Sequence, residues 1–461
     1  MVLLGRCKSV AVIMAEGEGS PHGLKRTIGV WGLTAMGIAA IIGAGIFVLT
    51  GVAAAKYAGP GIVLSFVVAG IVCALCAACY AELASTVPIS GSAYTYTYAT
   101  HGEFLAWIIG WDLVLEYAVG AATVSIGWSG YFSDLLRSAF DIVIPSALRA
   151  APGAGGVVNL PAMLIVLALS VLVAIGTQET NSVNMIVVAV KLLVVAFFLA
   201  VGFSHVNPAN WHPFLPFGWH GVFAGAGIIF FAYIGFDVVS TTAEEAKNPQ
   251  RDLPRGIIGS LVICTILYIL VAGTLTGMVP YHLLGVSSPV SFALLEVGLP
   301  WAAAIIAVGA IAGLTTVILS LLYGQSRIFF AMSRDRLLPP VFSRVHPVWR
   351  TPWRSTALVG IVVALLAGFT PIETVAKLTN IGTLAAFFLV SIAVIILRRN
   401  APQLKRGFRV PGVPVVPILA ALGSLYLITQ LPFETIVRFF VWLAIGLVIY
   451  YFYGRKTSKL A

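Results

Sequence analysis

Twelve stretches of nearly uninterrupted apolar residues run along this chain and limit its fold more than any other feature. At roughly 20 residues each, they are long enough to cross a hydrocarbon core ~30 Å thick as helices. They cover residues 30–57, 60–88, 104–132, 160–176, 182–204, 221–245, 255–279, 300–326, 354–370, 374–397, 413–431 and 434–453. No ten-residue alternation of lipid-facing and lumen-facing positions recurs, which excludes a membrane β-barrel. The sequence therefore predicts an all-α membrane protein with about 12 transmembrane helices.

Composition agrees with this fold class, and the distribution of charge predicts an orientation. Mean hydropathy is +1.00 and only 10% of the residues are charged, which excludes a soluble domain. Most of the 27 basic residues precede the first span or follow the sixth, eighth, tenth and twelfth spans, all on one side of the membrane. Basic loops favour the cytoplasmic side. We therefore expect a multi-pass protein of the plasma (inner) membrane with both termini in the cytoplasm, and the net charge of +10 does not indicate a nucleic-acid partner.

The two ends of the chain are expected to lie in the cytoplasm, and its cysteines are expected to serve packing. Residues 1–28 are interpreted as a cytoplasmic segment, with an interfacial helix as one form it can take, and residues 454–461 as a cytoplasmic tail. Cys73, Cys76 and Cys79 have a spacing like that of iron–sulfur ligands, but they lie inside an apolar span without a fourth ligand, which favours packing. The span map places every histidine in a loop. Neither a metal nor a cofactor is predicted.

The stretch "IIGAGIF", residues 41–47, places two glycines in the middle of the first span. Glycine in a membrane helix serves either close packing between helices or a break in the helix. Gly29 precedes Gly43 by 14 residues, and in the sixth span Gly221 precedes Gly235 by the same number. At 1.5 Å per residue both inner glycines lie ~21 Å along their spans, near mid-membrane. The match predicts an inverted repeat of five plus five spans, covering about 29–204 and 221–397, with extra helices at 413–453.

Paired breaks of this kind indicate a substrate site. Unwinding exposes N–H groups at the start of one half-helix and carbonyl groups at the end of the other. The N–H groups attract a carboxylate and the carbonyl groups attract an ammonium group. A zwitterionic α-amino acid carries both. A channel would instead show repeated filter loops or rings of like charge, and the sequence has neither.

Several motifs resemble those of the amino acid–polyamine–organocation superfamily, and most closely its cationic amino acid transporter branch. They are "IIGAGIF" with "GVAAAKYAGP", "YAELASTVPISGSAYTYTY", "GWDLVLEY", "FFAYIGFDVVSTTAEEAKNPQRDLPRGI", "YGQSRIFFAMSRDRLLP" and "FRVPGVPVVP". The resemblance implies a LeuT-type fold and uptake of amino acids. It places the carboxylate-binding amides on Gly43, Ala44, Gly45 and Ile46, and the amine-binding carbonyls on Ile41, Phe231, Ala232 and Ile234.

Lys191 lies about nine residues into the fifth span, ~14 Å deep, where its stem does not easily reach water. The resemblance implies that a lysine here, between the first and eighth helices, replaces the sodium ion of sodium-coupled relatives. Its ammonium group would brace the unwound first helix and release it on losing its proton. Thr315 and Thr316 are its expected acceptors. The alternative is a permanently paired structural lysine.

Glu116 lies ~18 Å along the third span, near the level of the breaks. Three roles fit it: a proton carrier, a counter-ion for the side chain of the substrate, or a structural hydrogen-bond acceptor. For Asp112 and Asp237, which also lie inside spans, a structural role is favoured. By the resemblance, Leu321 lines the side-chain end of the pocket, where a bulky apolar residue would narrow it; ordinary packing is the alternative.

The sequence therefore predicts a proton-coupled transporter that takes up L-amino acids, cationic or neutral, by alternating access. The alternatives are a proton-independent facilitator or exchanger and, outside this class, a polytopic membrane enzyme. An enzyme would need catalytic groups clustered within reach of one another, and no histidine falls inside a predicted span. The expected partners are an amino acid, a proton and the lipid bilayer, and the sequence carries no signal for or against a small accessory subunit.

Overall fold

The computed structural model describes residues 28–88, 92–176, 181–349 and 351–458. Helix dominates these residues, which contain no strand and only two isolated β-bridges, Ile28 with Ala246 and Arg149 with Asn159. In the described part, 8 helical stretches are long and apolar enough to cross a membrane, and four shorter apolar helices accompany them. Together these match the twelve spans expected from the sequence, so the chain is an all-α membrane protein.

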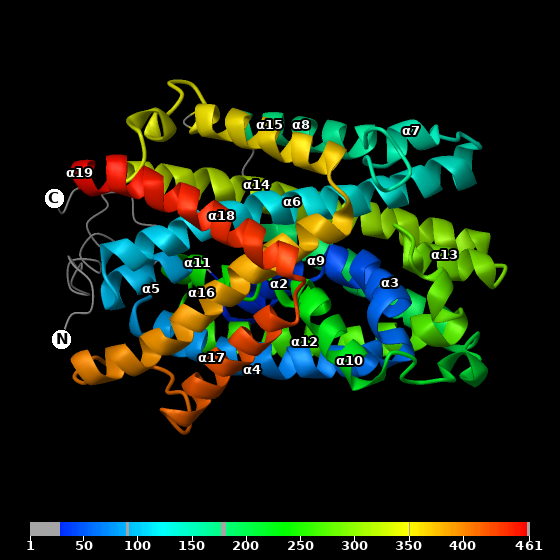
Figure 1. Cartoon of the computed structure of the whole chain (residues 1–461), viewed down its shortest axis with the longest axis horizontal. Helices are drawn as coiled ribbons and strands as arrows, with labels where there is room; N and C mark the ends of the chain where they lie inside the picture. The colour runs from blue at the N-terminus through cyan, green and yellow to red at the C-terminus, as the bar shows by residue number, and fades with distance from the viewer. Residues whose placement is uncertain (1–27, 89–91, 177–180, 350, 459–461) are drawn as a thin grey trace.

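Figure 1 shows the helices packed side by side, with most of their axes along the length of the molecule. The helices that make up the apolar spans are α2 (Val30–Ile41), α3 (Thr50–Ala53), α4 (Ile62–Thr86), α6 (Glu103–Phe140), α8 (Leu160–Ile175), α9 (Asn181–Phe203), α10 (Gly218–Ile229), α11 (Val238–Thr241), α12 (Pro249–Met278), α14 (Pro300–Arg334), α15 (Trp353–Phe369), α16 (Ile372–Asn400), α17 (Val415–Thr429) and α18 (Phe433–Ile449). Short helices join them: α5 (Ser92–Thr100), α7 (Ser146–Arg149), α13 (Pro289–Glu296) and α19 (Arg455–Thr457).

Turns of 3₁₀ and π-helix occur at the helix breaks, at helix ends and in the connections between helices. Three π-helical turns, η1 (Gly45–Leu49), η2 (Ala54–Ala58) and η9 (Tyr450–Gly454), occur with 3₁₀ turns η3 (Gly59–Gly61), η4 (Pro208–Trp211), η5 (Phe230–Tyr233), η6 (Ala243–Glu245), η7 (Tyr281–Leu283) and η8 (Pro340–Ser343). Turns of these types inside a membrane helix often mark functional positions, since they leave backbone groups out of the regular ladder. Of these, η1 and η5 lie within the two spans that the glycine pattern singled out.

Two groups of helices pack within themselves. The first group, here called the core group, comprises α2, α4, α10 and α12: α12 packs on both α4 and α2, and α10 packs on α4. The second, the scaffold group, comprises α6, α8, α14 and α15: α6 packs on α14, and α15 packs on α8 and α6. Among the helices that the structure describes, α9 and α16 are two that contact both groups. α9 contacts α2, α12 and α14, and α16 contacts α4 and α6.

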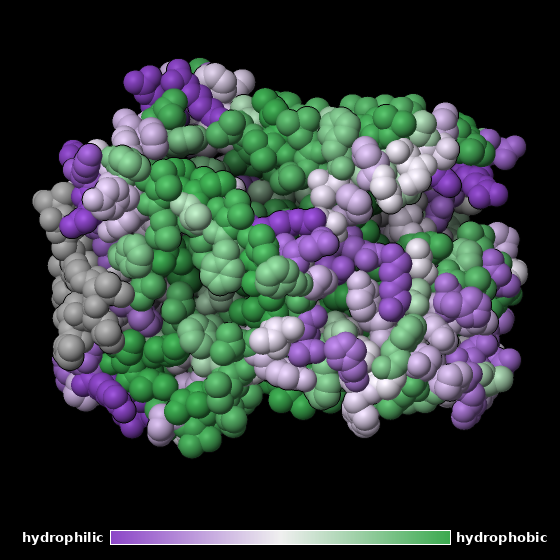
Figure 2. Space-filling view, in the orientation of Figure 1, coloured by the Kyte–Doolittle hydropathy of each residue, from purple (hydrophilic) through white to green (hydrophobic). Residues whose placement is uncertain are grey.

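The exterior is apolar where a bilayer would surround it. Large apolar side chains are exposed along the outer helices, including Leu164, Leu193, Val262, Leu365 and Phe440. Figure 2 shows broad hydrophobic areas over the outer helices, and hydrophilic side chains at both ends of the long axis and in a patch near the middle of this face. Charged residues that fall inside the spans, among them Asp112, Glu116 and Lys191, are buried in the protein, where protein groups replace lipid around them.

Helix bounds differ from the predicted spans mainly at their ends. The seventh span starts at Pro249 rather than at 255, because charged residues of its first turns lie beyond the apolar stretch yet continue the helix. A short helix, α5, occupies the predicted loop 89–103. His220 lies in the first turn of α10 and is exposed, so the expectation that every histidine lies in a loop was wrong. The predicted N-terminal segment lies outside the described residues except for Ile28.

Candidate functional site

The first predicted span is broken where the glycines lie. α2 ends at Ile41, and Ile42 has an extended backbone with φ −74° and ψ 99°. The chain then turns through Gly43 and Ala44, and helix resumes as the π-helical turn η1 at Gly45. The first N–H groups of a resumed helix have no partner within that helix. The amide groups of residues 43–46 lie at this helix start, and their role in binding a carboxylate stays a prediction.

The sixth span is broken at the corresponding place. α10 ends at Ile229 and continues as the 3₁₀ turn η5 to Tyr233. Ile234 is extended, with φ −61° and ψ 133°, and Gly235 has a φ of +121°, which only glycine adopts without strain. Helix resumes at Val238. The carbonyl groups of Phe231, Ala232 and Ile234 thus lie at the end of a half-helix, as a site for an ammonium group requires.

The two breaks contact each other through small residues in a reciprocal way. A Cβ added to Gly45 would lie 2.3 Å from Cα of Ala232, and one added to Gly235 would lie 2.8 Å from the carbonyl carbon of Ala40. Each break therefore presents a glycine to an alanine of the other break, and neither glycine has room for a side chain. Gly43 differs, because a Cβ there would meet only Val317, at an ordinary 3.5 Å.

A tyrosine from α12 joins the two breaks. The Tyr268 hydroxyl lies 2.8 Å from the carbonyl oxygen of Ile41 and 2.8 Å from that of Ala232. One hydroxyl proton serves one acceptor at a time, while each carbonyl has two lone pairs. Both carbonyl groups can therefore also accept from a substrate ammonium group. The sequence analysis missed Tyr268. The signal that could have identified it is a tyrosine hydroxyl in the middle of the apolar seventh span.

Lys191 lies fully buried on α9 between the first and eighth predicted spans. Its ammonium group donates to the carbonyl oxygen of Ala39 at 2.7 Å, one turn or less before the first break. Its stem crosses α14 closely, since a Cβ on Gly313 would lie 3.1 Å from its Cε. The hydroxyl of Thr315 donates to Ile311 and accepts from Trp128, and that of Thr316 donates to Gly313. The pairing of either threonine with Lys191 stays a prediction.

Three buried carboxyl groups gather beside the second break. Glu116 and Asp112 lie one helical turn apart on α6, and Asp237 follows Gly235 by two residues in the sixth span. Thr383 of α16 lies within hydrogen-bonding reach of Glu116. A Cβ on Gly382 would lie 2.8 Å from Oδ1 of Asp112, so α16 passes directly over this cluster.

Leu321 lies on α14, partly buried, and faces α6. A Cβ on Gly120 would lie 3.6 Å from its Cδ1 and 3.7 Å from Cγ2 of Thr379. Gly120 is one helical turn from Glu116, and Thr379 is one turn from Thr383. Leu321 and Glu116 thus lie at neighbouring levels of one interface between α6, α14 and α16.

Comparison with known proteins identifies the family of this chain. A family model described as amino acid permease matches residues 28–453. The branched-chain amino acid permease BcaP of Bacillus subtilis (strain 168) is 53% identical over 460 residues, which are 99% of this chain and 98% of that protein. The methylthioribose transporter of the same organism is 50% identical over 462 residues, 100% of both chains. The vacuolar cationic amino acid transporter 4 of Arabidopsis thaliana is 39% identical over 401 residues, 86% of this chain and 66% of that protein.

These relatives are all transporters by name, and the family model spans nearly the whole chain. The broken helices meet in the interior of a multi-pass membrane protein, as a carrier with a central site requires. The chain therefore belongs to the amino acid permease family, and it is a membrane transporter rather than an enzyme.

Proposed function

We propose that this chain imports L-amino acids by alternating access and that protons drive the uptake. The observation that carries the proposal is the meeting of the two breaks: a helix start at Gly45 and a half-helix end at Ala232 lie in contact, and Tyr268 bridges carbonyl groups from both. A carboxylate on the amides of 43–46 and an ammonium group on the carbonyls of Ile41 and Ala232 would engage both halves of one zwitterion.

The inverted repeat supports the transport cycle in this proposal. Residues 29–204 and 221–397 would form the two repeats, with 413–453 as added helices. Basic loops would place both termini in the cytoplasm and the protein in the plasma membrane. A substrate held by both breaks would then be exposed alternately to each side as the core group moves against the scaffold group.

Proton coupling is supported by the buried charges. Lys191 donates to the turn that ends the first half-helix, so loss of its proton would remove a brace from α2. Glu116 offers a second route, because it is a buried carboxyl group inside a membrane span, where an ionisable group is expensive and often functional. A facilitator or exchanger that uses no proton is the competing proposal within the family.

The test is uptake into liposomes that contain the purified protein. An inward proton gradient should drive labelled amino acid above equilibrium without sodium, and collapse of the gradient should end the accumulation. Unlabelled leucine, alanine, arginine and methylthioribose should be added as competitors, with leucine amide as the matched control for the carboxylate. We expect leucine amide to compete at least roughly tenfold more weakly than leucine, because it lacks the charge that the amides hold.

Equal competition by leucine and its amide would contradict the assignment of the carboxylate to residues 43–46. Methylthioribose is included because a relative of full-length similarity carries its name. It has neither an α-carboxylate nor an α-ammonium group. If labelled methylthioribose is taken up while labelled amino acids are not, the amino acid proposal would be replaced by a ribose thioether as substrate.

A second experiment separates the roles of Glu116. If Glu116 pairs with the side chain of the substrate, Glu116→Gln should weaken arginine uptake at least roughly tenfold more than leucine uptake, since the loss of one charge-assisted pair is specific to the cation. If it carries a proton or positions α16, both substrates should lose rate alike. The measurement is the ratio of kcat/KM values for the two amino acids. An unchanged ratio with both rates reduced would remove the counter-ion role.

A further inference from the structure

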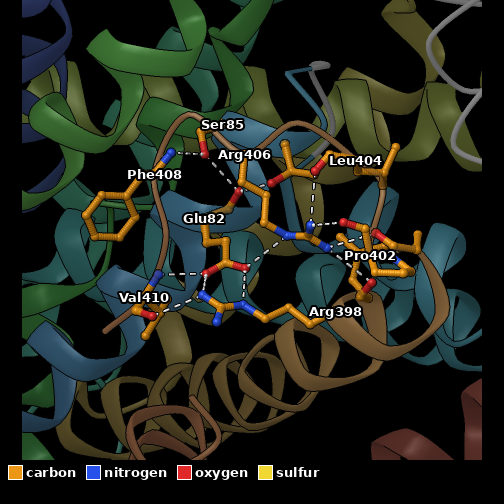
Figure 3. Close-up of polar contacts among 11 residues, drawn as sticks. Glu82, Ser85, Arg398, Pro402, Leu404, Arg406, Phe408 and Val410 are labelled. Carbon is orange, nitrogen blue, oxygen red and sulfur yellow. Dashed lines mark hydrogen bonds and ion pairs between the residues drawn. The ribbon is translucent and has the colours of Figure 1, made fainter. Parts of the chain in front are cut away.

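Glu82, at the end of α4, is the centre of a buried ionic cluster away from the substrate site (Figure 3). Its side chain is 2% exposed. Oε1 and Oε2 accept from Nε and Nη2 of Arg398 on α16 at 2.8 and 2.6 Å, a bidentate pair. Nε of Arg406 lies 3.4 Å from Oε1, and the amide of Val410 donates to Oε2 at 2.7 Å. One carboxylate thus holds two guanidinium groups and a backbone amide.

The segment that supplies these last two groups, residues 401–414 between α16 and α17, is here called the strap. It is held at both sides. Arg406 donates to the carbonyl oxygen of Leu397, in the last turn of α16, and to that of Ala401, which follows this helix. The Phe408 amide donates to the hydroxyl of Ser85 on α4 at 3.1 Å. Figure 3 shows these contacts converging from α4, α16 and the strap. The strap therefore crosses from α16 to the end of α4.

The strap also reaches α12. A Cβ on Gly407 would lie 2.3 Å from the carbonyl oxygen of Gln250, in the first turn of α12. Only a glycine permits so close an approach of two backbones. Through the strap, α16 is thus connected to the ends of two helices of the core group, α4 and α12. Because α16 also packs on α6, the strap connects the core group to a helix that rests on the scaffold group.

We propose that Glu82 and the strap form a latch that holds the core group closed at this end of the molecule. Opening of the substrate site toward this end requires α4 and α12 to move away from the scaffold group. With the latch formed, such a movement breaks a buried carboxylate–guanidinium pair or carries α16 along. The latch therefore sets how often the site is open to this side. The inference rests on the alternating access proposed above, but it involves no substrate or proton.

The physical argument is a difference between two states. A buried carboxylate with two guanidinium partners is stable while all partners are present, and the loss of one partner leaves an uncompensated charge. The closed state makes all these contacts, so removal of the Glu82 charge weakens the closed state more than the open one. A two-state equilibrium shifts by that difference alone.

The test measures the opening directly, in the absence of substrate. Cysteines replace Arg251 on α12 and Arg334 on α14, both exposed near this end, in a background with Cys7→Ser, and spin labels on them report the distance between the two groups. Glu82→Gln keeps the shape of the side chain but removes its charge. We expect the distance distribution to shift toward longer values. Glu82→Asp, which keeps the charge on a shorter side chain, should fall between Glu82→Gln and the parent.

Gly407→Ala tests the latch without changing a charged residue of the ionic cluster. The added methyl group cannot fit against Gln250, so the strap must move, and the same lengthening is expected. Glu434→Gln on α18 is the matched control, since it removes an exposed ion pair with Arg438 by the same substitution. In liposomes, both latch variants should raise the KM for amino acid supplied from the other side roughly five- to tenfold, because less protein faces that side.

The proposal is overturned if folded Glu82→Gln and Gly407→Ala proteins keep the parent distance distribution, since the cluster would then be a static brace. Should Glu82→Gln fail to fold, Gly407→Ala decides by itself. A lengthened distance in protein that transports no amino acid would support the latch and contradict only the proposed function. The two proposals can therefore fail separately.

Discussion

Gly45→Ala is expected to abolish substrate binding, although it adds a single methyl group. The methyl carbon would lie 2.3 Å from Cα and 2.4 Å from Cβ of Ala232, a residue of the other break. Neither contact can be relieved by a rotamer change, so the two breaks must separate. Overpacking of this kind costs about 1–3 kcal/mol or more, which corresponds to a loss of affinity of up to ~100-fold or beyond. Binding of labelled leucine to purified protein measures the loss.

Gly43→Ala is the matched control for this substitution. The same methyl group at Gly43 meets only the side chain of Val317 at 3.5 Å, so the space exists. We expect leucine affinity to change by less than roughly fivefold, a cost below ~1 kcal/mol. The larger Gly43→Val is expected to impair binding, because β-branching restricts the backbone at the break. Equal effects of alanine at the two glycines would show that the contact with Ala232 does not position the site.

Lys191→Ala is expected to remove the ability to concentrate substrate while leaving substrate binding measurable. The ammonium group braces the last turn of α2 through its hydrogen bond to the carbonyl oxygen of Ala39. The substitution leaves the amide and carbonyl groups of the breaks in the protein, so they can still bind substrate. With a proton gradient across the liposome, the ratio of internal to external amino acid should fall from above one to about one. This is what a carrier without coupling reaches at equilibrium. Time courses of uptake with and without the gradient provide the measurement.

Lys247→Ala serves as the control for loss of a lysine. Lys247 is exposed before α12, and its backbone amide, which donates to Ile28, is kept by the substitution. Accumulation should be unchanged. If Lys191→Ala protein still concentrates amino acid, the coupling role passes to the cluster of Glu116, Asp112 and Asp237, and Lys191 becomes a structural cation. In that case Glu116→Gln is the variant expected to lose accumulation.

Much of the fold could be predicted from the sequence, because the properties that determine it are local. Whether a segment crosses a bilayer depends on the hydrophobicity of about 20 consecutive residues, and the twelve spans were located within a few residues at most ends. The helix breaks could also be predicted, since Gly43, Gly45 and Gly235 lie at mid-span. The burial of Lys191 and Glu116 followed from their depth alone.

The contacts across the site could not be predicted in the same way, because they depend on how distant helices are rotated and spaced. Nothing local to the sequence distinguishes Gly43 from Gly45, yet only Gly45 faces the backbone of Ala232. The sequence does not distinguish Tyr268 from the other residues of the apolar spans. The packing of α12 places its hydroxyl beside both breaks. Glu82 lies near the end of α4, but its bidentate partner Arg398 is 316 residues away in the sequence. Span position and depth are properties of one segment, whereas these contacts exist only when helices from separate parts of the chain meet at a particular rotation, and so the tertiary structure alone decided them.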